Sequence, residues 1–153
     1  EKGEQRSERF LSINPNGRIP ALIDRARGVT VAESGAILEY SAARFASPLL
    51  PPAHEDLQLH LQTKQWLHWQ VSALGPSMGQ AMYFQRIAKV RGQNDPFAIG
   101  RFIAEAERCL RMLDDQLASS SGRLCSVSVA HSWMSPVSLT ALVLIGQMSI
   151  SRR

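Results

Sequence analysis

Two short apolar runs that are typical of β-strands lie on either side of a charged turn near the start of the chain. The runs cover residues 19–23 and 29–32, and residues 24–28 form the turn. This pattern predicts a β-hairpin. Pro20 lies in the first run, and because proline has no N–H to donate, it belongs at the start or edge of a strand. A sheet of two strands is marginal alone, so the hairpin must pack against helices.

Helical periodicity follows the hairpin. Ser34 is expected to be the N-cap of a helix that runs to about Phe45, and Pro48, Pro51 and Pro52 mark a linker. Beyond the linker, two segments repeat apolar residues every three or four positions, which predicts two amphipathic helices. The apolar positions are Leu67, Val71, Leu74, Met78 and Met82 in the first segment, and Phe102, Ala106, Leu110, Leu113 and Leu117 in the second.

Both predicted helices carry further signals. Pro76 lies inside the first helix and should kink it, because it removes a backbone hydrogen bond. Asn94, Asp95 and Pro96 are expected to start the second helix. Cys109 borders the apolar face of that helix, which favours a buried structural thiol over a nucleophile.

Composition excludes several classes of protein. The 153 residues, 44% hydrophobic and 20% charged, suit a globular protein of one or two small domains, and the net charge of +4 is too scattered to predict nucleic-acid binding. Residues 137–145, the longest apolar stretch, are too short to span a membrane. We therefore expect no membrane partner. Two cysteines favour a reducing, cytoplasmic location, and the histidines lack further ligands at metal spacing, so no metal is expected.

Two dipeptides in this region suggest a ligand. If the Ile19–Pro20 bond is cis, the backbone of Ile19 faces outward and can pair with an extended peptide, although a trans edge proline fits the local sequence equally well. The helix start at Ser34 offers N–H groups and a hydroxyl to a carboxylate, and Glu33 can accept from an ammonium. An ordinary helix cap is the alternative. Together, however, the two dipeptides favour a site for an amino-acid head group.

The stretches NPNGRIPALID and ESGAILEY resemble the glutathione-binding half of glutathione transferases. The resemblance implies an α+β fold, with a partial thioredoxin-like domain over residues 1–48 and an all-helical domain over residues 49–153, of which residues 120–153 are a divergent tail. It also implies that Ile19 binds the cysteinyl backbone of glutathione, that Pro20 is the cis proline, and that Glu33 and Ser34 hold the γ-glutamyl head.

Residues 65–84, QWLHWQVSALGPSMGQAMYF, are similar to the first helix of the C-terminal domain in the bacterial nu class of this family. The resemblance, which covers roughly residues 1–124, makes Gln5 a further glutathione contact. It also suggests that Arg101 reaches a glutathione carboxylate, although a solvated helix arginine is an equal alternative. By resemblance we expect a homodimer that acts on glutathione and a small electrophile or disulfide.

The sequence departs from the family at both ends. The opening strand, helix and second strand of the family have no counterpart, so no catalytic residue can be assigned to activate the glutathione sulfur. Near the other end, His131 replaces the expected acid of a Ser-x-x-Asp capping box that begins at Ser128, and no acidic residue follows Asp115. We therefore expect a glutathione transferase-like protein, for conjugation or disulfide reduction, with impaired activity. The alternative is a non-catalytic dimerising or interaction module.

Overall fold

A computed structural model of the chain describes residues 3–48 and 50–119. The chain divides into two compact units, of which the first ends at Leu61 and the second begins at Gln62. The boundary between domains that we predict, after residue 48, lies earlier, in the linker, and remains a prediction. The expectations for Ser128, His131 and the rest of the tail concern residues outside the described ones.

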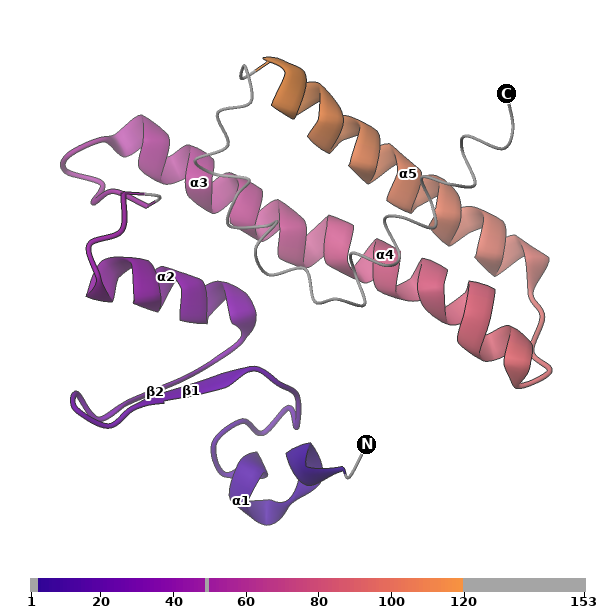
Figure 1. The fold of residues 1–153 in the computed structure, drawn as a ribbon, viewed down its shortest axis with the longest axis horizontal. Helices are drawn as coiled ribbons and strands as arrows, with labels where there is room; N and C mark the ends of the chain where they lie inside the picture. The colour runs from indigo at the N-terminus through magenta and orange to yellow at the C-terminus, as the bar shows by residue number, and fades with distance from the viewer. Residues whose placement is uncertain (1–2, 49, 120–153) are drawn as a thin grey trace. The chain divides into compact units, whose positions relative to one another are not determined.

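The first unit begins with two short helical turns and the predicted hairpin (Figure 1). A 3-10 turn covers Glu4–Arg6, and α1 covers Glu8–Leu11. Strand β1 covers Ala21–Asp24 and β2 covers Val29–Ala32, paired antiparallel with Ala21 opposite Ala32. The first strand thus starts two residues later than expected, which places Ile19 and Pro20 before the ladder.

Helix α2 covers Ser34–Arg44 and packs against both strands. Ile37 on this helix is 4% exposed. The hydroxyl of Tyr40 donates a 2.6 Å hydrogen bond to Oδ2 of Asp24, the last residue of β1. Arg44 lies 3.8 Å from the same oxygen. The two strands and the helix that follows them therefore form the small thioredoxin-like part of an α+β fold.

A nearly continuous helical run follows the linker (Figure 1). It comprises α3 (Leu57–Trp69), a π-helical segment (Gln70–Leu74), α4 (Gly75–Met82) and a second π-helical segment (Tyr83–Ala88). Pro76 lies in the first turn of α4, directly after the first π-helical segment, where Gly75 donates to the carbonyl of Gln70. The structure shows a widened turn directly before this proline, and the kink predicted at Pro76 stays a prediction.

The widened turn changes one predicted face. Leu67, Leu74 and Met78 are buried as expected, but Val71 is 38% exposed. A π-helical turn holds more residues than an α-helical turn, so the period of 3.6 residues that we assumed breaks at this point. The expectation that Val71 lies on the buried face is wrong for this reason.

Helix α5 covers Pro96–Ser119 and lies beside α4. It begins as predicted, with Oδ1 of Asp95 accepting a 3.0 Å hydrogen bond from the N–H of Ala98. The core between the two helices is formed by Leu74, Met78, Ala81, Ala106 and Cys109. The rings of Phe84 and Phe102 stack beside this core at 5.5 Å. The second unit is thus helical over its described residues except for the turn at residues 91–95.

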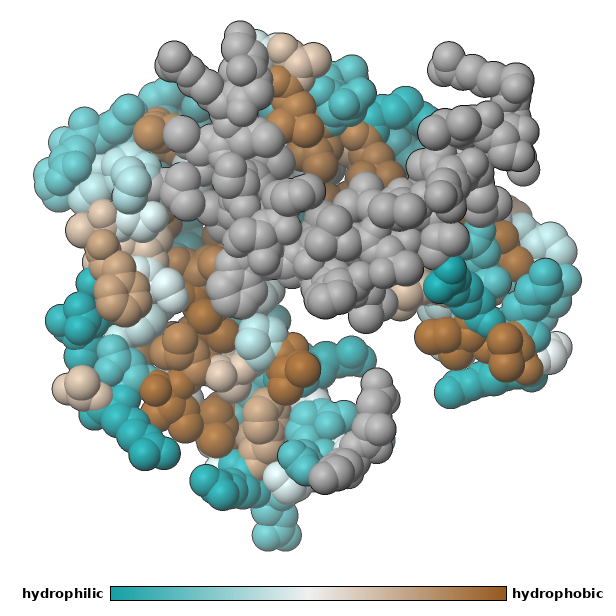
Figure 2. Space-filling view, in the orientation of Figure 1, coloured by the Kyte–Doolittle hydropathy of each residue, from teal (hydrophilic) through white to brown (hydrophobic). Residues whose placement is uncertain are grey.

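Some large apolar side chains remain at the surface. In the second unit, Val90 is 89% exposed and Phe97 is 77% exposed. Val90 ends the helical run and Phe97 lies in the first turn of α5, on either side of the connecting turn, where Figure 2 shows apolar surface beside polar surface. The core of this unit therefore lies between the two helices and does not extend to this turn.

Candidate glutathione site

The loop before β1 is organised by one buried asparagine. Asn14 is 4% exposed, and its amide Nδ2 donates a 2.6 Å hydrogen bond to the carbonyl of Arg18. Its Oδ1 accepts a 3.0 Å bond from the N–H of Asn16, and its carbonyl accepts a 2.9 Å bond from the N–H of Gly17. A buried side chain amide that is bonded in this way holds the loop in one conformation.

Gly17 allows this loop to approach the N-terminal turns closely. Its φ is 62°, in the left-handed region that favours glycine. A Cβ at this position would lie 3.2 Å from Cδ2 of Leu11 and 3.3 Å from the carbonyl of Gln5. The glycine of the NPNG motif therefore brings Gln5 beside the start of the hairpin, although the two are distant in the sequence.

Ile19 lies on the surface next to this loop. The Ile19–Pro20 peptide bond is cis, which confirms the conformation that the family resemblance implies. The side chain of Ile19 is 78% exposed. An open hollow of about 560 Å³ lies beside it, lined by Gln5, Arg6, Leu11, Asn16, Gly17, Arg18 and Ile19. Two of the predicted site residues, Gln5 and Ile19, thus line one hollow.

Glu33 and Ser34 follow β2, where α2 begins, at the same end of the hairpin as Ile19 and Pro20, because Ala32 pairs with Ala21. The N-cap is Glu33, whose carbonyl accepts a 3.0 Å hydrogen bond from the N–H of Ile37, and Ser34 is the first helical residue. The expectation that Ser34 is the N-cap is therefore wrong, because the sharp turn from β2 into α2 falls one residue earlier. No side chain caps this helix.

The backbone of Glu33 is strained. Its φ of 70° and ψ of 125° lie outside the regions that residues with a side chain prefer. Its carboxylate is exposed, and Oε1 accepts a long hydrogen bond of 3.5 Å from Nδ2 of Asn16. This contact links Glu33 to the loop that precedes the cis proline.

The hollow also contains two cations that the sequence analysis did not select. Arg6 and Arg18 both line it, and both are exposed. Two guanidinium groups at one hollow favour a ligand that carries a carboxylate. The signal in the sequence was the position of Arg18 directly before the Ile-Pro step, whereas nothing local to Arg6 distinguishes it from other surface arginines.

Arg101 is the predicted site residue that belongs to the second unit. It lies exposed on α5, in the second unit, and its positive charge contributes to lowering the pKa of Glu105. Within this unit Arg101 is a solvated helix arginine, which is the alternative that the sequence left open. Its role at a glutathione carboxylate stays a prediction.

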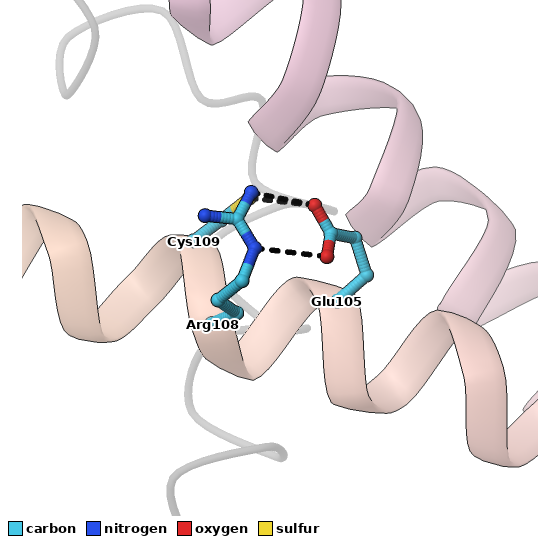
Figure 3. Close-up of polar contacts among 3 residues, drawn as sticks. All are labelled: Glu105, Arg108 and Cys109. Atoms are coloured by element: carbon cyan, nitrogen blue, oxygen red, sulfur yellow. Dashed lines mark hydrogen bonds and ion pairs between the residues drawn. The ribbon is translucent and has the colours of Figure 1, made fainter.

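The thiol of Cys109 has a structural environment (Figure 3). Cys109 is fully buried, and its Sγ lies 3.8 Å from Oε1 of Glu105 and 3.7 Å from Nη2 of Arg108. Burial raises the pKa of the Cys109 thiol. The bidentate pair between Arg108 and Glu105 lowers the pKa of Glu105 and raises that of Arg108. A buried thiol with a raised pKa is a poor nucleophile, as expected from the sequence.

Residues 3–48 and 50–119 show neither a metal cluster nor a membrane-spanning helix. No group of three or more His, Cys, Asp or Glu side chains in this part of the chain is arranged to hold a metal ion. None of the helices in the same part combines the length and apolar character that a bilayer crossing requires.

Comparison with known proteins defines the class. The model of the glutathione S-transferase N-terminal domain matches residues 1–43. Disulfide-bond oxidoreductase YfcG of Escherichia coli is 38% identical over 124 residues, which cover 78% of this chain and 54% of that protein. The two sequence stretches, the hairpin and the helical pair thus all point to one class of protein.

Solved structures agree with this class. A glutathione transferase homologue of Lodderomyces elongisporus, with two GSH per subunit, superposes with a TM-score of 0.69 at 30% identity, over 81% of this chain and 58% of that one. A glutathione transferase of Pseudomonas putida, with one glutathione disulfide per subunit, gives 0.69 at 34% identity, over 76% and 50%. The chain is therefore similar to glutathione transferases over about three quarters of its length, and its first 43 residues match the N-terminal domain of that family. It spans about half the length of the curated relatives it matches.

Proposed function

We propose that the first unit binds glutathione along the hairpin and the start of α2. In this proposal the backbone of Ile19, held by the cis bond to Pro20, pairs with the cysteinyl residue of the ligand, in the manner of an added strand. Glu33 accepts from the γ-glutamyl ammonium. Ser34 and the free N–H groups of the first turn of α2 bind the γ-glutamyl carboxylate.

The observation that carries the proposal is the placement of Gln5 and Ile19 around one open hollow. The contact from Asn16 to Glu33 then connects this hollow to the start of α2. A strained, exposed acid at a helix start is a further indication, since strain of this kind concentrates at ligand sites. Gln5 is a candidate donor to the peptide part of the ligand.

The two arginines that line the hollow are candidates to bind the second carboxylate of the ligand. Glutathione carries a second carboxylate, on its glycine, and a guanidinium is well suited to bind it. We assign Arg6 and Arg18 as the candidates within the first unit. Arg101 is the candidate within the second unit.

The reaction that this binding would serve is thiol conjugation to an electrophile or reduction of a disulfide. Relatives named disulfide-bond oxidoreductase and structures of relatives with glutathione disulfide support the second choice. We propose that the 153-residue chain alone has little turnover, because none of its residues is assigned to stabilise the glutathione thiolate. We also propose a homodimer, as in the family resemblance.

Calorimetric titration of glutathione and its disulfide tests this proposal. We expect measurable binding to the chain, and about tenfold or greater loss of affinity in Ser34→Ala, because a hydrogen bond to a charged carboxylate is lost. Ser72→Ala is the matched control, since Ser72 is an exposed serine in the second unit.

Two results would contradict the proposal. An absence of binding to the unchanged chain favours the non-catalytic module. Equal affinities of the unchanged chain and Ser34→Ala exclude the head-group assignment. A conjugation or disulfide-reduction assay on the same chain tests turnover, and a rate typical of efficient enzymes, with kcat/KM above about 10⁴ M⁻¹s⁻¹, would show that the low-turnover proposal is wrong.

A further inference from the structure

The turn from Asn14 to Arg18 contacts both parts of the candidate site. On one side, Nδ2 of Asn14 donates to the carbonyl of Arg18, directly before Ile19. On the other side, Nδ2 of Asn16 reaches Oε1 of Glu33, seventeen positions away. The N–H of Asn16 is in turn held by Oδ1 of Asn14 at 3.0 Å. The backbone of Asn16, which carries this side chain, is therefore held by a buried residue.

The geometry points to Asn16 as a positioning residue that gives this site its selectivity for a ligand with an α-amino group, and we propose this role, which rests on the proposed function. The carboxylate of Glu33 is exposed, so without a partner it can rotate among several rotamers. A donor on Oε1 limits this rotation and leaves Oε2 with both lone pairs for an incoming ammonium.

This role differs from a general structural role for the loop. Asn16 is itself exposed, so its side chain contributes little to the burial that holds the loop. The loop is held by Asn14, which is buried and bonded to three backbone groups through its side chain and carbonyl. Truncating Asn16 should therefore weaken only the binding contacts made by Glu33. Altering Asn14 should also weaken the binding contacts made by the backbone next to Arg18.

Two ligands separate these effects. The probes are glutathione and an analogue in which hydrogen replaces the α-amino group of the γ-glutamyl residue. The hydrogen bond from Asn16 to Glu33 is long, so its loss should have a modest effect. We expect Asn16→Ala to lower the affinity for glutathione by about two- to tenfold and to change the affinity for the analogue by less than about twofold. Asn94→Ala, an exposed asparagine in the second unit, is the control and should change neither affinity.

A second variant guards against a loop effect. Asn14→Asp keeps the acceptor for the Asn16 N–H but loses the donor to the Arg18 carbonyl. It should therefore lower the affinities for glutathione and for the analogue by similar factors. The inference is overturned if Asn16→Ala weakens both ligands equally or neither. If the unchanged chain binds no glutathione, the proposed function fails and the inference fails with it. Normal binding by the unchanged chain with equal losses for both ligands rejects the inference alone.

Discussion

The hydroxyl of Tyr40 donates a 2.6 Å hydrogen bond to Oδ2 of Asp24, and this bond joins α2 to the end of β1. Oδ1 of Asp24 also accepts from the backbone N–H of Arg27, at 3.2 Å, so the same carboxylate closes the hairpin turn. The bond to Tyr40 is the main cause that lowers the pKa of Asp24, and it raises the pKa of Tyr40. One carboxylate therefore joins the turn to the helix that starts at the candidate site.

We predict that Tyr40→Phe lowers the stability of the chain at neutral pH. A lowered pKa in the folded state means that Asp24 contributes stability above its unfolded pKa, and that this contribution disappears as the pH falls through the folded pKa. The raised pKa of Tyr40 means that its contribution is complete below its unfolded pKa and is lost as the pH rises through the folded value. Urea midpoints of the two proteins should differ most between these limits and should converge below the ordinary pKa of Asp24, 3.8.

A constant difference between Tyr40→Phe and the unchanged chain down to strong acid would contradict this prediction. Ser41→Ala is an unsuitable control because its hydroxyl donates to the carbonyl of Ile37. Thr30→Val is better, since Thr30 is an exposed residue of the same hairpin.

Truncation of the helical core should be costly. Leu74 is 1% exposed and lies in the cluster between α4 and α5. We expect Leu74→Ala to lower the free energy of unfolding by about 2–5 kcal/mol, because it removes buried apolar surface and leaves a cavity. Leu57→Ala makes the same chemical change at a side chain that is 58% exposed, and should cost less than about 1 kcal/mol. Urea denaturation of both variants provides the measurement, and equal losses would show that the core is assigned wrongly.

Relief of the strain at Glu33 should separate stability from binding. Glycine adopts a φ of 70° without penalty, so Glu33→Gly should raise the free energy of unfolding by about 1 kcal/mol relative to Glu33→Ala, which keeps the strain. Both variants lose the carboxylate and should bind glutathione more weakly. Thermal denaturation and calorimetric titration measure the two effects. If Glu33→Gly is no more stable than Glu33→Ala, the strain has no energetic weight.

Cys109 should react slowly with alkylating reagents while the chain is folded. Burial raises the pKa of its thiol, which lowers the fraction of reactive thiolate at neutral pH, and it also blocks access. We expect iodoacetamide to modify the peptide that contains Cys109 at least about tenfold more slowly in buffer than in urea, as followed by mass spectrometry. Rapid modification in buffer would indicate an accessible nucleophile instead.

Local sequence predicted several elements well. The Asp-Pro step placed the start of α5, and the turn residues between two apolar runs placed the hairpin, with β2 over the expected residues. These features depend on backbone chemistry within a few residues, such as a missing N–H or a capping carboxylate. Such chemistry follows directly from the residue types.

Other features required the tertiary structure. The π-helical segment before Pro76 moved Val71 out of the core, because a regular period cannot foresee a widened turn. The N-cap of α2 fell on Glu33 because the chain turns sharply from β2. Both differences arise where the backbone departs from regular geometry, so periodicity and cap preferences apply to the wrong residue.

By itself, the sequence predicted the resemblance to glutathione transferases, the fold class and the two dipeptides Ile19–Pro20 and Glu33–Ser34, because each depends on residue types at short spacing. Only the tertiary structure decided that Gln5 meets Ile19 at one hollow, that Arg6 and Arg18 share it, and that Asn16 reaches Glu33. These contacts join residues up to seventeen positions apart. Gln5 comes close to this loop because Gly17 permits an approach that no local pattern encodes.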